Sequence, residues 1–475
     1  MRAGIDALVE KRWEHGTSRW VFSSEEQASE TDLLELLRQI TTRYTDKTVR
    51  QQLAARIAEP GGIERLAELL PPTAPAAAPT LAYLAAVTKD HSHLSASVLL
   101  IRQALALCPG SASFMRMHMH MLELQLNHRG ALLVLLRFCE TNPQRRVRQL
   151  TCARFAAGLS AAMLDSTYEA NPARDSIAGH TASNAEAQAA RGESHSDVHR
   201  LDDETGMEEV ELLSAFLTAV RLLFTMRAIA PLSRLLRLVE PVRDGMDPEL
   251  LSLPAVHSEN AFLIYITKLL PTIPSVLNPD LPVLHVVGDS HCLSPAWRTI
   301  SVGGEPHLVV PRLITGLKVW HLRSSSTFYT KAHFDASLQQ VPDGSLLVFL
   351  LGFIDCREGL PTALEHGVYQ TLEEGVDVLV QTYVDTLGSL CLRRGVRIFV
   401  HPVPPVIEEM QEIVALFNCK LRAQVMATSG LMWLAMFDHL TLVPKDLQLD
   451  GLHLHPQYLP QLEQGIEAHS NPAQE

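Results

Sequence analysis

The hydrophobic pattern of the chain changes at about residue 276, and this change sets the fold class. Before it, apolar residues recur at helical spacing, as in ETDLLELLRQI (30–40). After it, short apolar runs alternate with helical segments at 361–394 and 406–427, a pattern typical of a parallel sheet with helices on both faces. We therefore expect an α-helical N-terminal part and an α/β C-terminal part. The expected strands are VLHVV (283–287), LVVP (308–311), LKVWHL (317–322), SLLVFLLG (345–352), VRIFVHP (396–402) and MWLAMF (432–437).

The length and local composition suggest where the domains begin and end. The chain has 475 residues, enough for about two to three domains. A Pro/Ala-rich stretch, PPTAPAAAP (71–79), breaks the helical pattern as a loop or linker. Small polar residues replace hydrophobic ones at 165–207, which predicts a disordered insertion, and helices resume at 208–228, 231–240 and 258–270. We therefore expect a helical region at 1–78, a helical repeat-like domain at 79–275, an α/β domain at 276–470 and a disordered tail at 471–475.

Two prolines in the helical part, Pro109 and Pro143, stand 34 residues apart, and each closes an apolar helix. The segments SASFMRMHMHMLELQL and ALLVLLRFCE between them are predicted to form a helix pair with Gly130 at the turn. A 34-residue helix–turn–helix unit ending in proline resembles the tetratricopeptide repeat, over about residues 79–163. The Trp, Gly and Tyr positions of the repeat's first helix are not matched, and a generic helical bundle is the alternative. The resemblance implies a protein-interaction module with a protein partner.

Charge and cysteine content exclude several classes of protein. The formal net charge is −13, whereas nucleic-acid-binding domains are usually basic, so we expect no nucleic-acid partner. The seven cysteines are odd in number and widely spaced, which fits neither a disulfide scaffold nor a zinc finger. His118 and His120 cannot share a helix face and no HExxH motif occurs, so we expect no metal and no cofactor.

Hydropathy argues for a soluble, cytoplasmic protein with no membrane span. No stretch of about 18 uncharged apolar residues occurs, as a membrane-spanning helix would need. Asp6, Glu10 and Lys11 interrupt the N-terminal segment where a signal peptide needs an apolar core. The unpaired cysteines fit the same reduced, intracellular compartment.

Two short segments at the ends of the α/β part contain the residue types of a nucleophilic site. The first strand leads into Gly288-Asp289-Ser290-His291, and a serine on a sharp turn between a strand and a helix presents its hydroxyl above the sheet. The alternative is a plain turn with a helix-capping Ser or Asp. Near the C-terminus, Asp450 precedes His453 by three residues and can accept the Nδ1–H of its ring, which leaves Nε2 free to act as a base.

Together these segments resemble the SGNH/GDSL hydrolase family, over about residues 281–468. Gly288-Asp289-Ser290 is similar to the family's first block, and Asp450-Gly451-Leu452-His453-Leu454 followed by Pro456 to its last. Gly316 stands where the second-block glycine falls. Gly352-Phe353-Ile354-Asp355 matches the third block at its first and last positions.

The resemblance implies a three-layer α/β/α domain with a parallel, flavodoxin-like sheet. It also implies acyl transfer, in which Ser290 attacks an ester carbonyl, His453 takes its proton and Asp450 orients the imidazole. We therefore expect Ser290 Oγ within about 2.6–3.2 Å of a His453 ring nitrogen. The backbone N–H groups of Ser290 and Gly316 would form the oxyanion hole.

The chain departs from the family pattern at two positions. Ile354 replaces the third-block Asn, and loss of one oxyanion donor costs about 10²–10³ in rate. Arg357 could supply a substitute cation, or it could pair with Asp355 and fix the loop. His291 replaces the usual Leu. It is either an ordinary polar residue of the first helical turn or a second hydrogen-bond donor near the nucleophile, which would contact the oxyanion or an anionic substrate.

The sequence thus favours a serine-dependent ester hydrolase or O-acyltransferase that acts on an esterified or acylated small molecule or glycan. The alternative is a catalytically inactive SGNH-like domain in a scaffold or binding protein. A phosphate-binding turn at Gly288 is disfavoured because neither a Gly-x-Gly-x-x-Gly motif nor a P-loop lysine is present.

Overall fold

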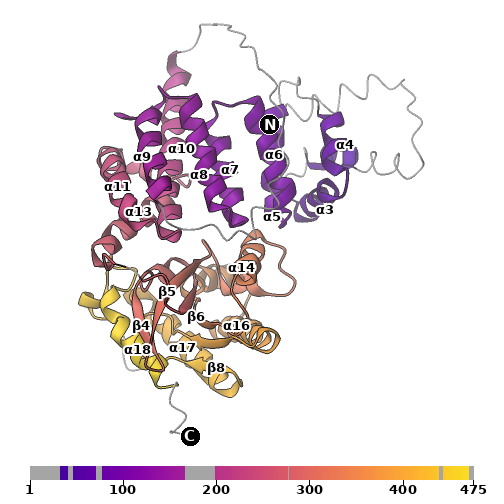
Figure 1. Ribbon diagram of the computed structural model, residues 1–475. Helices are drawn as coiled ribbons and strands as arrows, with labels where there is room; N and C mark the ends of the chain where they lie inside the picture. The colour runs from indigo at the N-terminus through magenta and orange to yellow at the C-terminus, as the bar shows by residue number, and fades with distance from the viewer. Residues whose placement is uncertain are drawn as a thin grey trace. The chain divides into compact units, whose positions relative to one another are not determined.

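The computed structural model describes residues 33–40, 46–70, 77–165, 198–276, 278–437 and 442–469. The chain divides into two compact units, and Figure 1 labels helices and strands of both. One contains Met1–Pro109, Met117–Ala131 and Ile264–Glu475, and the other contains Gly110–Arg116 and Leu132–Leu263. The N-terminal half is α-helical and the C-terminal half contains a curled mixed sheet, as the change in hydrophobic pattern predicts.

The helical half begins at residues 33–40 and continues to the start of the sheet. A two-stranded hairpin, β1 (Arg146–Val147) with β2 (Leu150–Thr151), interrupts it. The helices are α3 (Lys47–Ala58), α4 (Gly62–Leu69), α5 (Ala77–Asp90), α6 (Leu94–Leu107), α7 (Ala112–Leu124), α8 (His128–Thr141), α9 (Cys152–Asp165), α10 (Val198–Thr225), α11 (Ile229–Asp244), α12 (Pro248–Leu251) and α13 (His257–Leu269).

Three expectations for this half need correction or fall outside the described residues. Gly130 lies in the first turn of α8 rather than at the turn before it, because the Asn127 side chain accepts the Gly130 N–H at 2.8 Å and caps the helix. The expected loop at 71–79 is already helical from Ala77, and residues 71–76 lie outside the described part. The expected insertion at 165–207 is helical from Val198, while 166–197 and the tail at 471–475 lie outside the described part.

Buried aromatic and ionic contacts hold the second unit together. The rings of Phe155 on α9 and Phe216 on α10 stack with their centroids 3.8 Å apart. Arg221 on α10 pairs with Glu259 on α13 at 2.9 Å, and only 3% of the arginine side chain is exposed. A charge buried this deeply is stable because its partner carboxylate satisfies it.

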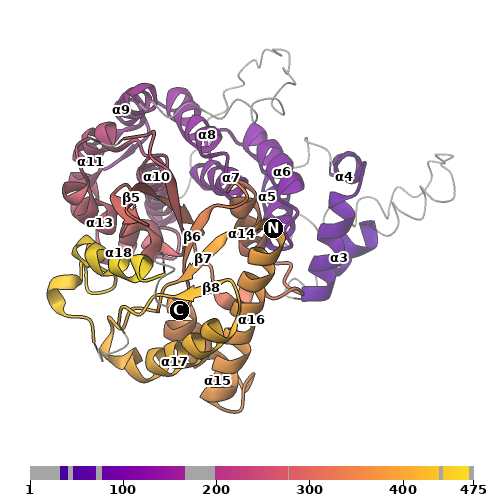
Figure 2. The ribbon, with the colours of Figure 1, turned by 60° about the horizontal axis from the view of Figure 1, so that its bottom comes forward.

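Over the described residues the sheet has six strands in the order β4-β5-β3-β6-β7-β8, and five of them run parallel. Figure 2 shows β6, β7 and β8 in succession across it. In chain order the parallel strands are arranged 2-1-3-4-5, so the order reverses between β3 and β6. The strands are β3 (Val283–Gly288), β4 (Thr299–Val302), β5 (Glu305–Leu313), β6 (Leu346–Leu350), β7 (Arg397–Val400) and β8 (Leu431–Trp433).

The expectation of a wholly parallel sheet was wrong at one edge. Strand β4 pairs antiparallel with β5 across the two-residue turn Gly303-Gly304. Both glycines have positive φ, at 62° and 82°, which the turn of such a hairpin requires. The Gly-Gly pair was therefore the sequence signal for the extra strand.

The segment LKVWHL (317–322) was also expected to be a strand, and it is not. Val319–Leu322 forms the 3-10 turn η4. The Asp355 carboxylate accepts the N–H groups of Val319 at 2.7 Å and Trp320 at 3.3 Å. Because these two N–H groups donate to the Asp355 side chain and not to a neighbouring strand, the segment forms a turn in place of a strand.

The helices after β5 are α14 (Tyr329–Gln339), α15 (Leu360–Glu365), α16 (Leu372–Arg394), α17 (Gln411–Ala427) and α18 (Leu459–Glu467). The longest, α16, begins where Thr371 accepts the N–H of Glu374 and ends at Gly395, whose φ is 59°. It packs against α17, and both helices contact β8. Within the ranges described here, no helix is long and apolar enough to cross a membrane.

Candidate active site

The turn after β3 is shaped by the close approach of two strands. A Cβ atom on Gly288 would lie 2.3 Å from the carbonyl oxygen of Leu350 on β6, so only glycine fits there. The buried Asp289 side chain accepts the His291 N–H at 3.0 Å and caps the short 3-10 turn η3 (Ser290–Leu293). Ser290 is therefore the first residue of a capped turn at the carboxyl end of β3, next to the point where the strand order reverses.

Ser290, His453 and Asp450 are joined by two hydrogen bonds in series. The distance between Ser290 Oγ and His453 Nε2 is 2.8 Å, inside the range expected from the sequence. The distance between His453 Nδ1 and Asp450 Oδ2 is also 2.8 Å. Since the ionised carboxylate can only accept, Nδ1 carries the proton and Nε2 is left to accept from the serine hydroxyl.

The loop that contains His453 is fixed by its own backbone. Asp450 Oδ1 accepts the N–H groups of Leu452 at 3.0 Å and His453 at 2.8 Å. The N–H of Leu449 donates to the His453 carbonyl at 2.8 Å, and Gly451 has a φ of 85°. The spacing of three residues therefore forms a tight turn that brings the carboxylate to the edge of the imidazole.

The Asp450 carboxyl group is held in its ionised form. Burial alone would raise its pKa, but the hydrogen bonds from the His453 side chain and from the backbone N–H groups outweigh burial and lower the pKa to about 2. Asp450 is thus an acceptor throughout the pH range in which proteins usually work.

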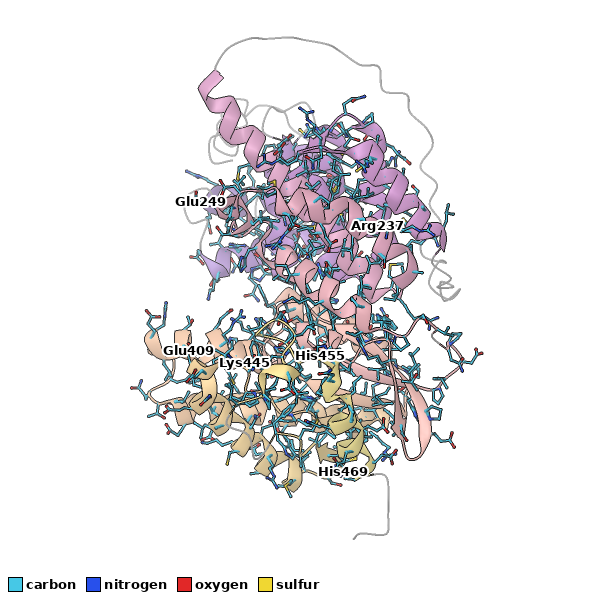
Figure 3. All side chains as sticks on the ribbon, turned by 90° about the vertical axis from the view of Figure 1, so that its left-hand side faces the viewer. Arg237, Glu249, Glu409, Lys445, His455 and His469 are labelled. Carbon is cyan, nitrogen blue, oxygen red and sulfur yellow. The ribbon has the colours of Figure 1, made fainter. Side chains whose placement is uncertain are left out.

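His455, labelled in Figure 3, lies two residues after His453 and has a structural role. Its Nδ1 accepts the N–H of Gln457 at 3.2 Å and caps the 3-10 turn η8 (Pro456–Tyr458). This cap fixes the exit of the histidine loop.

The third-block residues lie after β6 and support the loop of η4. Gly352 has a φ of 112°, and a Cβ there would lie 2.8 Å from the Phe417 ring. Asp355 is fully buried, and its burial raises its pKa to about 6 despite its bonds to the Val319 and Trp320 N–H groups. Asp355 is the first residue of the short π-helix η5 (Asp355–Gly359), so its bonds join this helix after β6 to the turn η4 after β5.

The pairing between Asp355 and Arg357 that the sequence suggested is not formed among the described side chains. Arg357 instead pairs with its neighbour Glu358, with 3.0 Å between Arg357 Nε and a carboxylate oxygen. The Asp355 carboxylate instead accepts backbone N–H groups of η4, which packs against it. The Arg357 guanidinium lies 5.9 Å from the centre of the Phe353 ring.

Gly316 lies in the exposed loop between β5 and η4 and has a φ of 69°. The N–H of Ile314 donates to the Gly288 carbonyl at 2.9 Å, so this loop begins beside the turn that contains Ser290. Ile354, in the helical turn that directly precedes Asp355, provides no side-chain hydrogen-bond donor.

His291 is buried beside the triad, with 1% of its surface exposed. Its ring centre lies 4.7 Å from that of His453 and 4.3 Å from that of Phe353. Neither ring nitrogen has a hydrogen-bond partner within the described part of the chain. Burial lowers the pKa of His291 well below its usual value, so the ring is neutral and carries one N–H donor.

Sequence reasoning missed one residue of the site, Tyr265 on α13. Its ring stacks on that of His453 with the centroids 3.8 Å apart and an angle of 13° between the planes. The apolar face of α13 gave no signal for this contact, because Tyr265 follows the same helical spacing as the buried Leu269.

Among the described residues, no group of three or more His, Cys, Asp or Glu side chains is arranged to hold a metal ion. Comparisons of the chain with protein-family models, with curated proteins and with solved structures found no match.

Proposed function

We propose that this chain is a serine-dependent ester hydrolase or O-acyltransferase of SGNH type. The observation that carries the proposal is the pair of 2.8 Å hydrogen bonds that link Ser290 Oγ to His453 and His453 to Asp450. The location of Ser290, at the carboxyl end of β3 where the strand order reverses, adds support because open α/β sheets bind ligands there. In this proposal the C-terminal half is a three-layer α/β/α domain.

The reaction follows from the order of these contacts. Ser290 Oγ attacks the ester carbonyl carbon while its proton passes to His453 Nε2. The resulting imidazolium is stabilised by the Asp450 carboxylate and then gives the proton to the leaving alkoxide. The acyl group remains on Ser290 until water, in a hydrolase, or an acceptor hydroxyl, in a transferase, attacks it with His453 again acting as the base.

The oxyanion of the tetrahedral intermediate needs donors that Ile354 cannot supply. In this proposal the backbone N–H groups of Ser290 and Gly316 provide two of them. The neutral His291 ring, whose nitrogens have no partner among the described residues, lies beside the nucleophile and is suited to provide a third.

The proposed substrate is an esterified or acylated small molecule or glycan. We assign the helical half, with its tetratricopeptide-like spacing, to binding a protein partner. We also propose a cytoplasmic location, which the free cysteines fit.

A second candidate function is an inactive SGNH-like domain in a scaffold protein. The specific observation in its favour is Ile354, because the family's Asn at that position donates to the oxyanion. The two hydrogen bonds that connect Ser290, His453 and Asp450 favour catalysis, since an inactive scaffold does not need these three side chains to be hydrogen-bonded to one another.

Hydrolysis of 4-nitrophenyl acetate separates the two candidates. We expect Ser290→Ala and His453→Ala to lower kcat/KM by at least about 10³-fold, and Asp450→Asn by about 10²–10⁴-fold because it stabilises the wrong imidazole tautomer. Ser337→Ala, at a buried serine of α14, is the matched control and should retain full activity. Equal activity of the wild-type chain and Ser290→Ala would contradict the proposal.

A further inference from the structure

Tyr265 packs its ring flat against the imidazole of His453. It belongs to α13, which precedes the sheet in the chain, and it is completely buried. The small angle of 13° and the centroid distance of 3.8 Å place the two rings face to face. Asp450 fixes the imidazole through one atom at its edge, so rotation of the ring about that hydrogen bond is limited by what packs on its faces.

The Ser294 hydroxyl connects the nucleophile turn with the histidine loop, and the Tyr265 hydroxyl binds to it. Ser294 Oγ lies 2.6 Å from the Tyr265 hydroxyl and 2.7 Å from the carbonyl oxygen of Leu454. The single Ser294 hydroxyl proton goes to Leu454, so the Tyr265 hydroxyl is the donor toward Ser294. Ser294 directly follows the turn that begins at Ser290, and Leu454 directly follows His453, so the Ser294 hydroxyl joins the two segments and the Tyr265 hydroxyl donates to it.

We propose that Tyr265 is a positioning residue for the His453 imidazole. This inference rests on the proposed esterase or acyltransferase function and adds a role that neither Ser290 nor Asp450 performs. The tyrosine ring keeps the imidazole plane aligned with Ser290 Oγ. Its electron-rich face also attracts the positive charge that His453 acquires on taking the serine proton. Both effects act on the transition state, where alignment and charge decide the rate.

The rate of labelling by a fluorophosphonate tests this role, because the probe reacts with a serine activated by a base. We expect Tyr265→Leu to slow labelling about tenfold, and Tyr265→Phe, which keeps the aromatic face, to restore the rate to within about threefold of wild type. Phe334→Leu is the control, since it removes a buried ring of α14 that lies 6.3 Å from the Phe349 ring of β6. It should lower the melting temperature without slowing the labelling.

A second readout does not depend on activity. The Cε1–H resonance of His453, assigned with His453→Gln, should lie upfield in the wild type because of the stacked ring. It should move downfield in Tyr265→Leu and stay in place in Tyr265→Phe. Tyr265→Met serves for the same comparison if the Leu variant does not fold.

The outcomes for the two proposals are distinct. Labelling of Tyr265→Leu at the wild-type rate, or an unshifted His453 resonance in that variant, would overturn the role of Tyr265. A folded wild-type chain that the probe does not label would overturn the proposed function instead, and the resonance would still decide whether Tyr265 holds the ring.

Discussion

At the scale of single residues, Asp289 combines two demands that conflict. Its carboxyl group must accept the His291 N–H to form the turn of Ser290, yet it is fully buried. Burial raises its pKa to about 7, the nearby Asp355 adds to this rise, and the His291 N–H and Arg357 only partly oppose it. The folded chain therefore binds a proton here that the unfolded chain releases near pH 4.

This pKa predicts a pH dependence of stability with a definite sign. A group whose pKa is raised by folding stabilises the fold fully below its unfolded pKa, and that stabilisation is lost as the pH rises through about 7. Asp289→Asn keeps an oxygen for the His291 N–H and removes the charge. We expect it to be more stable than the wild type at pH 8 by on the order of 1–3 kcal/mol and equally stable near pH 4.

Urea unfolding at pH 4, 6 and 8 measures this difference. Asp385→Asn, on the exposed face of α16, is the control and should follow the wild type at every pH. A constant difference between Asp289→Asn and the wild type across the three pH values would show that Asp289 does not titrate as described.

At the scale of elements, the contact between β3 and β6 determines where Ser290 lies. The methyl group of Gly288→Ala would meet the Leu350 carbonyl oxygen at 2.3 Å, and a backbone atom cannot move aside as a flexible side chain can. We expect this variant to lose about 1–3 kcal/mol of stability through overpacking and to lose esterase activity as the strands separate.

The matched substitution is Gly388→Ala in the helix α16, where the nearest atom to the new methyl group is a Thr428 methyl at 3.6 Å. This variant should gain up to about 1 kcal/mol, because alanine favours a helix more than glycine does. Chemical denaturation of both variants makes the comparison. Equal stability of the two would mean that β3 and β6 are not in close contact at Gly288.

The elements also show how far local sequence patterns can be interpreted. Strands β3 and β6 were predictable because each is a short, mostly apolar run followed by a turn. The segment at 317–322 has a similar apolar run, but it forms η4 because Asp355, more than thirty residues later in the chain, binds its N–H groups. A window of local sequence contains no information about such a distant acceptor.

At the scale of the whole molecule, the site also combines residues that local sequence predicts with one that depends on a distant contact. Asp450 and His453 could be paired from the sequence because three residues separate them and a tight turn joins them. Ser290 could be added to this pair for two reasons. It follows a predicted strand, where sites of open α/β sheets lie, and the surrounding residues resemble those of a known family. Tyr265 could not, since its contact with His453 joins segments almost two hundred residues apart and a buried tyrosine on a helix usually signals only core packing.

The central claim is that Ser290 is a nucleophile activated by His453. Incubating the purified full chain with a fluorophosphonate and locating the adduct by peptide mass spectrometry tests it most directly. We expect a single adduct on Ser290 that is absent from Ser290→Ala and His453→Ala, with both variants folded. An unlabelled, folded wild-type chain, or an adduct on a different serine, would contradict it.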